Sequence, residues 1–355
     1  MTFKVTLDKI GSATKNAVVE RDVYLTDEII AKEGYVVAVR VLYDKAVYNL
    51  LENIHGRMMR VKPGDVVAGV LGQRRALRGY SGDVPAELHV GDRLNILNMG
   101  GVIGRCTSFA PDVGEPFETE LVGAVLHFPN LGERTSEPAH IGLNAIPDLG
   151  FTEVPAPVIA VVGTCMNAGK TAAACEIIHG LVRNGFRVAA AKVTGVALER
   201  DMLNMRDHGA YEALSFNDAG LASTGPGTSL AAAKRIVSRL GRSQPQVIVL
   251  EFGDGLLGEY GIHSILADQD FRSWIRAVVL CANDPVGASG AVSLLKERYE
   301  LSTSVVTGPV TDNEVGVGYA RTALGVPAAN ALTSPKQLAD CVQKAVFGGG
   351  DEEQR

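Results

Sequence analysis

The stretch Val158-Ile-Ala-Val-Val-Gly163-Thr-Cys-Met-Asn-Ala-Gly169-Lys170-Thr171 decides the fold of this chain. It opens with an apolar run typical of a buried strand and continues through a loop bounded by two glycines. The residues that follow, 169–184, favour a helix. A G-x-x-x-x-G-K-T spacing between a strand and a helix is the context in which a phosphate-binding loop forms.

The chemistry of such a loop requires this order of residues. Glycines let the chain turn its backbone N–H groups toward phosphate oxygens, and the following helix adds its positive N-terminus. We expect the side chain of Lys170 to neutralise charge on the β- and γ-phosphates and the hydroxyl of Thr171 to bind Mg²⁺. The remaining expected nucleotide contacts come from Gly163, Thr164, Asn167, Ala168 and Gly169.

Strands and helices alternate after residue 155. Apolar runs at 158–162, 187–193, 246–251 and 277–281 predict strands, with shorter ones at 304–306 and 327–330, and helices are expected at 169–184, 229–240 and 288–299. This alternation predicts an α/β domain with a mainly parallel sheet covered by helices. Right-handed crossovers then bring the carboxyl ends of the strands to one edge, where ligands bind.

The first half has a different texture. Short β-rich runs at 35–43, 65–71, 92–97, 102–106 and 121–128 are separated by glycine turns, and one helix is expected around 45–57. This pattern predicts a smaller, mainly-β domain, either a barrel or a sandwich. The glycine-rich 98–104 lacks a βαβ setting and is interpreted as a strand turn.

A chain of 355 residues exceeds the size at which one core usually stops growing, so two domains are expected. We place a mainly-β domain at 1–128, a proline- and glycine-rich connector at 129–156, the P-loop domain at 157–345 and a flexible tail at 346–355.

Composition excludes several classes of protein. The formal charge of −6 lacks the basic surplus of a nucleic-acid binder, and the short cationic run 73–78 is interpreted as a solvated loop or anion contact. Five scattered cysteines without a C-x-x-C spacing favour a reducing compartment. No export signal or membrane span is apparent, so we expect a cytoplasmic protein, in the form of a homodimer, with no membrane or nucleic-acid partner.

Charged residues follow the second and third strands of the P-loop half. Lys192 precedes Thr194 and Gly195 and is expected to face the γ-phosphate or an anionic substrate. Glu251 ends an apolar strand in a Walker B arrangement and is the first choice of Mg²⁺ ligand, with Asp254 second. Asp201 or Asp207 would serve equally as a metal ligand or as an ordinary helix residue. The glycines at 253, 255, 258 and 261 are expected to let the backbone approach substrate.

Two further loops at the same edge are candidates for reading the base. Asn283 follows the strand at 277–281, and Asn313 follows the one at 304–306. The sequence has no intact N-K-x-D guanine signature, which favours ATP over GTP.

Three motifs together resemble the dethiobiotin synthetase branch of P-loop proteins over about residues 156–330. They are the G-T-x-x-x-x-G-K-T loop, Lys192-x-Thr194-Gly195 and Glu251-x-Gly253-x-Gly255, with Phe252 standing where that branch has its first loop glycine. The resemblance implies an enzyme that phosphorylates a carbamate or carboxylate with Mg-ATP, using lysines around the anion. A second similarity is to the D-glutamate N-acetyltransferase family, in which the loop holds an acyl-CoA phosphate.

These observations favour an ATP- and Mg²⁺-dependent ligase or kinase that activates a small anionic substrate, with Lys170, Lys192 and Glu251 as its catalytic residues. Catalysis of this kind depends on positioning and charge neutralisation, so no acid–base triad is required. The alternatives are an acyltransferase whose P-loop holds coenzyme A, and a non-enzymatic nucleotide switch or delivery protein.

Overall fold

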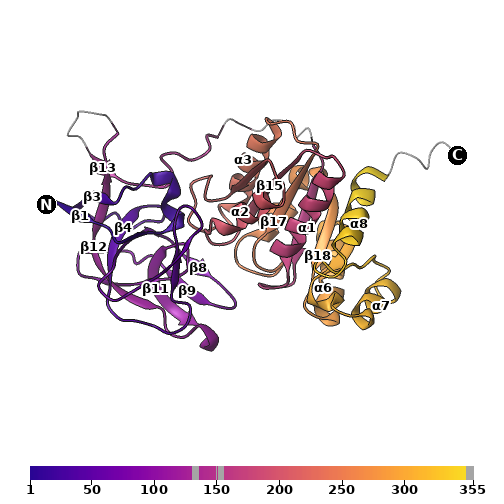
Figure 1. Cartoon of the computed structure of the whole chain (residues 1–355), viewed down its shortest axis with the longest axis horizontal. Helices are drawn as coiled ribbons and strands as arrows, with labels where there is room; N and C mark the ends of the chain where they lie inside the picture. Colours follow the sequence, from indigo (N-terminus) through magenta and orange to yellow (C-terminus); the bar gives the residue numbers. More distant parts are fainter. Residues whose placement is uncertain (130–135, 149, 151–155, 349–355) are drawn as a thin grey trace. The chain divides into compact units, whose positions relative to one another are not determined.

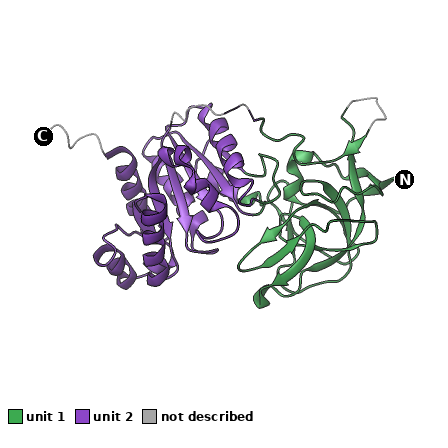
Figure 2. Cartoon of the chain, turned by 180° about the vertical axis from the view of Figure 1, so that it is seen from behind, with its two compact units in different colours: residues 1–147, 196–200, 216–223 green, residues 148–195, 201–215, 224–355 purple. Residues whose placement is uncertain are grey.

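The computed structural model describes residues 1–129, 136–148, 150 and 156–348. Residues 130–135, 149 and 151–155 of the expected connector, and residues 349–355 of the expected tail, lie outside the described residues. The chain forms two compact units (Figure 2). Unit 1 comprises residues 1–147, 196–200 and 216–223, and unit 2 comprises 148–195, 201–215 and 224–355. Two short segments of the second half of the sequence therefore belong to the unit built by the first half.

Unit 2 contains a six-stranded sheet in which every strand pairing is parallel. The strand order is β16-β15-β17-β14-β18-β19. The bounds are β14 Val158–Gly163, β15 Val188–Thr194, β16 Glu212–Ser215, β17 Val247–Phe252, β18 Ile275–Cys281 and β19 Val305–Thr307. β14 lies between β17 and β18, which places the loop that follows it at the centre of the carboxyl edge (Figure 1). The α/β fold predicted for this half is confirmed.

Helices cover both faces of this sheet. Their bounds are α1 Lys170–Arg183, α2 Arg200–Asp207, α3 Ser229–Gly241, α4 Ile262–Ala267, α5 Gln269–Trp274, α6 Pro285–Tyr299, α7 Glu314–Thr322 and α8 Pro335–Phe347. α1, α2 and α8 share one apolar core with the sheet, which includes Ile177, Met205 and Leu338. α1 and α8 also pack against each other, whereas α3 packs on α4. Because both faces are covered, all residues of β14 and β17 are buried, which explains why both strands are apolar except at Glu251.

Unit 1 is built on a mixed sheet whose pairings close into a ring. β12 (Phe117–His127) pairs with β4 (Val36–Val41), β4 with β7 (Val66–Leu71), β7 with β11 (Val102–Phe109), β11 with β10 (Arg93–Ile96), and β10 again with β12. Alternate residues point into the ring and form its core, as in any small barrel. The core includes Val37, Val39, Val67, Leu94, Ile103 and Leu121.

The remaining short elements lie outside this ring. They are β1 Thr2–Thr6, β2 Lys9–Ile10, β3 Asp22–Thr26, β5 Leu50–Glu52, β6 Met58–Arg60, β8 Arg74–Arg75, β9 Tyr80–Asp83 and β13 Glu137–Pro138, with 3₁₀ turns at Ser12–Ala17, Pro111–Val113 and Pro309–Thr311, the last in unit 2. β5 and β6 form a separate two-stranded sheet. The prediction of a mainly-β domain, with a barrel as one of its two forms, is confirmed.

Two predicted elements are wrong. The helix expected around 45–57 is absent, and its place is taken by the hairpin β5–β6. The Asn53 side chain accepts from the N–H groups of His55 and Arg57, and Gly56 has φ 79°, so local turn chemistry outweighs helical spacing. The expected strand at 327–330 is reduced to a single parallel bridge between Val306 and Ala328.

The structure also describes the cationic run 73–78 and the five cysteines. In the cationic run 73–78, Arg74 is buried and Arg75 pairs with Asp83, whereas Arg78 is exposed and pairs with Asp112. All five cysteines are free thiols. Within the part of the chain that the structure describes, no helix has both the length and the apolar character needed to cross a bilayer.

Candidate functional site

The loop between β14 and α1 has the backbone of a phosphate cradle. Asn167 and Gly169 adopt left-handed conformations, with φ of 60° and 89°. Gly169 is the N-cap of α1 and has no side chain with which to cap the helix, so it leaves the first amides of α1 to another acceptor. Neighbouring strands fix the ends of the loop, since Thr164 N–H donates to Cys281 O (3.0 Å) and Leu256 N–H donates to Gly163 O (2.9 Å). The loop is therefore held with an uncapped helix N-terminus, an arrangement that suits an anion.

Lys170 lies within this cradle. Its side chain is 6% exposed, and its Nζ donates to the carbonyl of Cys165 across the loop at 2.7 Å. A Cβ on Gly163 would stand 2.9 Å from Lys170 Cδ, so glycine is required there for the lysine to fold over the loop. Burial lowers the pKa of Lys170, and the nearby Glu251 carboxylate partly offsets this. A phosphate would supply the negative charge that this buried ammonium lacks at close range.

Thr171 and Glu251 are brought together as the sequence suggested. The Thr171 hydroxyl donates to Glu251 Oε1 at 2.9 Å. Glu251 pairs in register with Val161 of β14 on one side and with Lys192 of β15 on the other, which places it beside the loop. It is 2% exposed, burial raises its pKa, and its Oε2 has no hydrogen-bond partner among the described residues.

Asp254 is a second incompletely satisfied carboxylate. It is 6% exposed, and neither carboxylate oxygen has a hydrogen-bond partner in the described part of the chain. Its backbone has φ 72°, an unfavourable value for a residue with a side chain. Burial raises its pKa, while the nearby backbone N–H of Gly255 and the Lys170 ammonium lower it. Buried carboxylate oxygens without donors are uncommon in proteins and call for a cation or another explanation.

These oxygens suit Mg²⁺. The ion prefers oxygen ligands, is bound through one or two carboxylates, and takes its other positions from phosphate and water. Glu251, Asp254 and the Thr171 hydroxyl supply donors of that type. The described residues hold no group of three or more histidine, cysteine, aspartate or glutamate side chains suited to a metal.

Lys192 is placed at the carboxyl edge of β15, but it already has anionic neighbours. Its Nζ forms an ion pair with Asp201 and lies 3.8 Å from Glu251 Oε1. Asp201 is buried and therefore part of this charge cluster, whereas Asp207 is exposed. Of the two aspartates left open by the sequence, only Asp201 is near the site. No short-range sequence signal indicated that Asp201 pairs with Lys192.

The glycines after β17 lie where other parts of the protein approach closely. A Cβ on Gly253 would lie 2.2 Å from Thr194 O, and one on Gly255 would lie 2.5 Å from Thr164 O. Similarly, Gly258 makes room for the Asp254 carboxylate and Gly261 for Ser229. These glycines allow close packing of the protein around the site, and their contact with a substrate stays a prediction.

The two asparagines proposed to read the base lie at the same edge. Asn283 is exposed, and its Nδ2 is 3.0 Å from Cys165 Sγ of the loop. Asn313 caps α7, where its Oδ1 accepts from Val315 N–H at 3.0 Å. Gly308 packs against the carbonyl of Ala168, which brings the end of β19 to the phosphate loop. The capping role of Asn313 leaves its Nδ2 as the group for a ligand.

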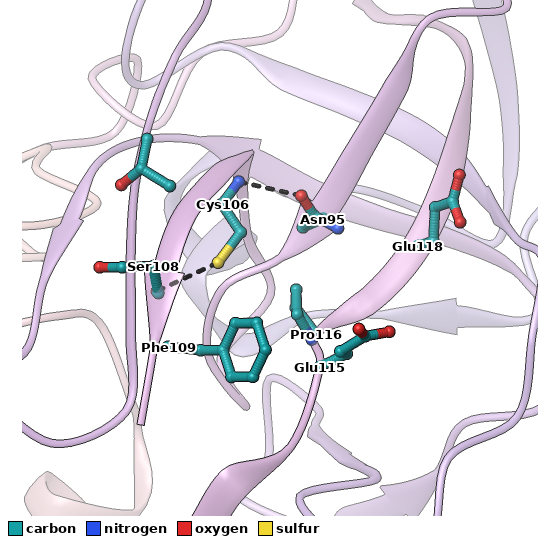
Figure 3. Close-up of a pocket in the computed structure, with 8 residues that line it drawn as sticks. Asn95, Cys106, Ser108, Phe109, Glu115, Pro116 and Glu118 are labelled. Carbon is teal, nitrogen blue, oxygen red and sulfur yellow. Dashed lines mark hydrogen bonds between the residues drawn. The ribbon is translucent and has the colours of Figure 1, made fainter. Parts of the chain in front are cut away.

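Unit 1 contains a separate hollow of about 320 Å³ on the barrel (Figure 3). It is lined by Asn95, Cys106, Thr107, Ser108, Phe109, Glu115, Pro116 and Glu118. Burial raises the pKa of the Cys106 thiol, which disfavours a reactive thiolate. Because two glutamates line this hollow and no basic residue does, it is poorly suited to an anionic substrate.

Comparisons with known proteins give no family. No family model matches the sequence, and no curated protein matches it. Among solved structures, a DUF1611 family protein from Anabaena variabilis is similar at TM-score 0.41 and 13% identity, covering 57% of this chain and 63% of that one. Chloroplast FtsY from Physcomitrella patens is similar at TM-score 0.38 and 13% identity, covering 58% and 70%.

FtsY from Thermotoga maritima is similar at TM-score 0.36 and 14% identity, covering 58% and 78%. The chain thus spans less than two thirds of the DUF1611 protein's length. Likeness this distant adds nothing to the site, whose interpretation rests on its own geometry.

Proposed function

We propose that this protein is a nucleotide- and Mg²⁺-dependent enzyme that activates a small anionic substrate, of carboxylate type, by phosphoryl transfer. The observation that carries the proposal is the combination at one sheet edge of a buried P-loop lysine and two buried carboxylates with unpartnered oxygens. A buried ammonium and buried carboxylates whose oxygens lack partners among the described residues are complementary to a magnesium–polyphosphate.

The residues have distinct roles in this proposal. Lys170 would move from the Cys165 carbonyl to the β- and γ-phosphates, and the first amides of α1 would hold the phosphate oxygens. Thr171, Glu251 and Asp254 would hold Mg²⁺, which neutralises phosphate charge when bound. Lys192, held by Asp201, would face the transferring group or the anionic substrate. The dethiobiotin synthetase-like assignment, ATP as the nucleotide, and a cytoplasmic homodimer remain parts of this proposal.

The first experiment measures which phosphorylated ligand binds. Thermal shift and calorimetry on the full chain would compare ATP, GTP and acetyl-CoA, each with and without Mg²⁺. We expect Mg-ATP to stabilise the protein most and its binding to weaken when Mg²⁺ is omitted. A thermal shift with acetyl-CoA that is larger than the shift with Mg-ATP and does not depend on Mg²⁺ would support the acyltransferase instead.

The second experiment measures turnover. A panel of small carboxylic and carbamic acids would be incubated with the protein and Mg-ATP while ADP release is followed. We expect at least one acid to stimulate ADP release, and Lys192→Met to reduce the stimulated rate more than the basal rate. Nucleotide-dependent dimerisation with no stimulated release across the panel would favour the switch.

A further inference from the structure

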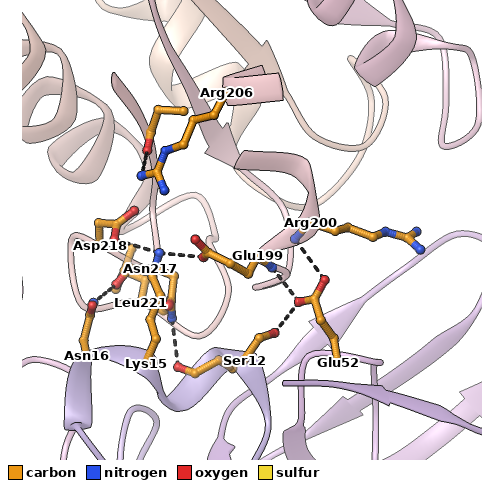
Figure 4. Close-up of polar contacts among 12 residues, drawn as sticks. Ser12, Lys15, Asn16, Glu52, Glu199, Arg200, Arg206, Asn217, Asp218 and Leu221 are labelled. Carbon is orange, nitrogen blue, oxygen red and sulfur yellow. Dashed lines mark hydrogen bonds and ion pairs between the residues drawn. The ribbon is translucent and has the colours of Figure 1, made fainter. Parts of the chain in front are cut away.

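A buried carboxylate in unit 1 binds the start of α2. Glu52, at the end of β5, is fully buried, and its oxygens accept from Glu199 N–H at 2.6 Å and Arg200 N–H at 2.9 Å (Figure 4). Ser12 Oγ also donates to this carboxylate. Unlike the carboxylates of the P-loop site, Glu52 has a donor for each oxygen.

The position of these donors gives Glu52 a capping role. Arg200 is the first residue of α2 and Glu199 immediately precedes it. The first N–H groups of a helix have no partner within the helix, and a negative group there also interacts favourably with the helix dipole. Glu52 therefore acts as an N-cap contributed from 147 positions earlier in the chain.

The surrounding contacts hold the same segment independently of Glu52. Lys15 forms ion pairs with Glu199 (2.7 Å) and Asp218 (2.8 Å), and Asn98 Nδ2 donates to Ala197 O at 2.7 Å. A Cβ on Gly100 would lie only 2.2 Å from the same Ala197 carbonyl, which explains a glycine in that turn. Lys15 and Asn98 thus contact Glu199 and Ala197 of this segment, whereas Glu52 binds the two N–H groups at the start of the helix.

The residue after Arg200 connects this cap to the candidate site. Asp201 is the second residue of α2, is buried, and forms the ion pair with Lys192. Its position depends on the first turn of α2 being intact. We propose that Glu52 is a positioning residue of the nucleotide site, which caps α2 and so holds Asp201 against Lys192. This inference rests on the proposed function in one respect, namely that Lys192 contacts the phosphate or the substrate.

The test is chemical labelling of Lys192 in the full chain without nucleotide. The protein is treated briefly with acetic anhydride, and modification of each lysine is measured by mass spectrometry. Glu52→Gln keeps the shape of the side chain but weakens the cap. We expect the labelling rate of Lys192 to rise about five-fold, the factor that corresponds to a typical cap, because the amine is released from Asp201.

Matched variants separate positioning from general loosening. Lys15→Met removes an ion pair to Glu199 but leaves the hydrogen bonds from the Glu199 and Arg200 N–H groups to Glu52. Lys192 labelling should therefore stay within about two-fold of wild type. Asp201→Asn should raise the labelling by itself, and adding Glu52→Gln should then change little, because both act through one contact. Ser12→Ala, which removes one donor to Glu52, should give a smaller rise and serves if Glu52→Gln does not fold.

The outcomes are distinguishable from those of the proposed function. Unchanged Lys192 labelling in Glu52→Gln, or effects of Glu52→Gln and Asp201→Asn that simply multiply, would overturn the positioning role. An equal rise in Lys15→Met would also overturn it, since the cap would not be the cause. Failure of the protein to bind any nucleotide would reject the proposed function, yet would leave the labelling result as it stands.

Discussion

Buried carboxylates occur in both units, and they differ in how their oxygens are satisfied. Glu52 of unit 1 accepts from a hydroxyl and two backbone N–H groups. Glu251 and Asp254 of unit 2 are as deeply buried but retain three oxygens without partners among the described residues. A buried charge whose donors are all present stabilises the fold, whereas one whose donors are missing destabilises it until a ligand arrives. The contrast separates a structural carboxylate from those of a binding site.

The largest expected effect is on nucleotide binding by the phosphate loop, which lies beside the carboxylates with unpartnered oxygens. Lys170→Ala should weaken nucleotide binding by roughly 30- to 5,000-fold, because truncating one partner of a buried charged contact has an effect of about 2–5 kcal/mol. Calorimetry with Mg-ATP measures it. Lys62→Ala, an exposed lysine of unit 1, is the control and should bind as wild type. Undiminished uptake of every ligand by Lys170→Ala would remove the basis of the proposed function.

The next effect concerns the satisfied carboxylate. Glu52→Ala should lower the free energy of unfolding by about 3 kcal/mol, because it leaves a hydroxyl and two buried N–H groups without an acceptor. Urea denaturation monitored by circular dichroism measures the change. Lys15→Met, which removes partly buried ion pairs of the same unit, should have a smaller effect. A loss below about 0.5 kcal/mol would show that water replaces this carboxylate and would break the contrast.

A change of opposite sign is expected at Asp254. Asp254→Asn removes an unpaired buried charge, so the ligand-free protein should become more stable by about 1 kcal/mol. The same substitution should reduce the Mg²⁺-dependent part of nucleotide binding, because a carboxylate ligand is lost. Denaturation without ligand and calorimetry with and without Mg²⁺ report the two effects. Destabilisation of the ligand-free protein would place Asp254 with Glu52 among the structural carboxylates.

The smallest effect is a dependence on pH. Burial raises the pKa of Asp254, so the folded protein binds more protons than the unfolded chain between the ordinary pKa, about 4, and the raised one. Stability therefore falls as pH rises through that window. The stability gained by Asp254→Asn should grow with pH across the window and be smallest at its acid end. A gain that is the same throughout, from urea titrations at several pH values, would contradict the assignment.

The phosphate loop was predictable because its determinants are adjacent in sequence. Gly163, Gly169, Lys170 and Thr171 lie within nine positions between a strand and a helix, and their spacing alone predicts where the backbone turns. Glu251 was predictable for a related reason, since a charged residue ending an apolar strand must reach the carboxyl edge of a parallel sheet. The identities of these residues and the order of the surrounding strands and helices were therefore within reach of sequence patterns.

The sequence by itself determined that one half of the chain is α/β and the other β-rich. It also determined where the phosphate-loop motif lies in the α/β half. Only tertiary structure decided that the first half closes into a ring and that residues 196–200 and 216–223 belong to its unit. It also decided that Asp201 pairs with Lys192 and that Glu52 binds the start of α2. The physical reason is range. A loop motif is specified by local conformation, but whether a buried carboxylate finds donors depends on which distant backbone groups the fold brings to it.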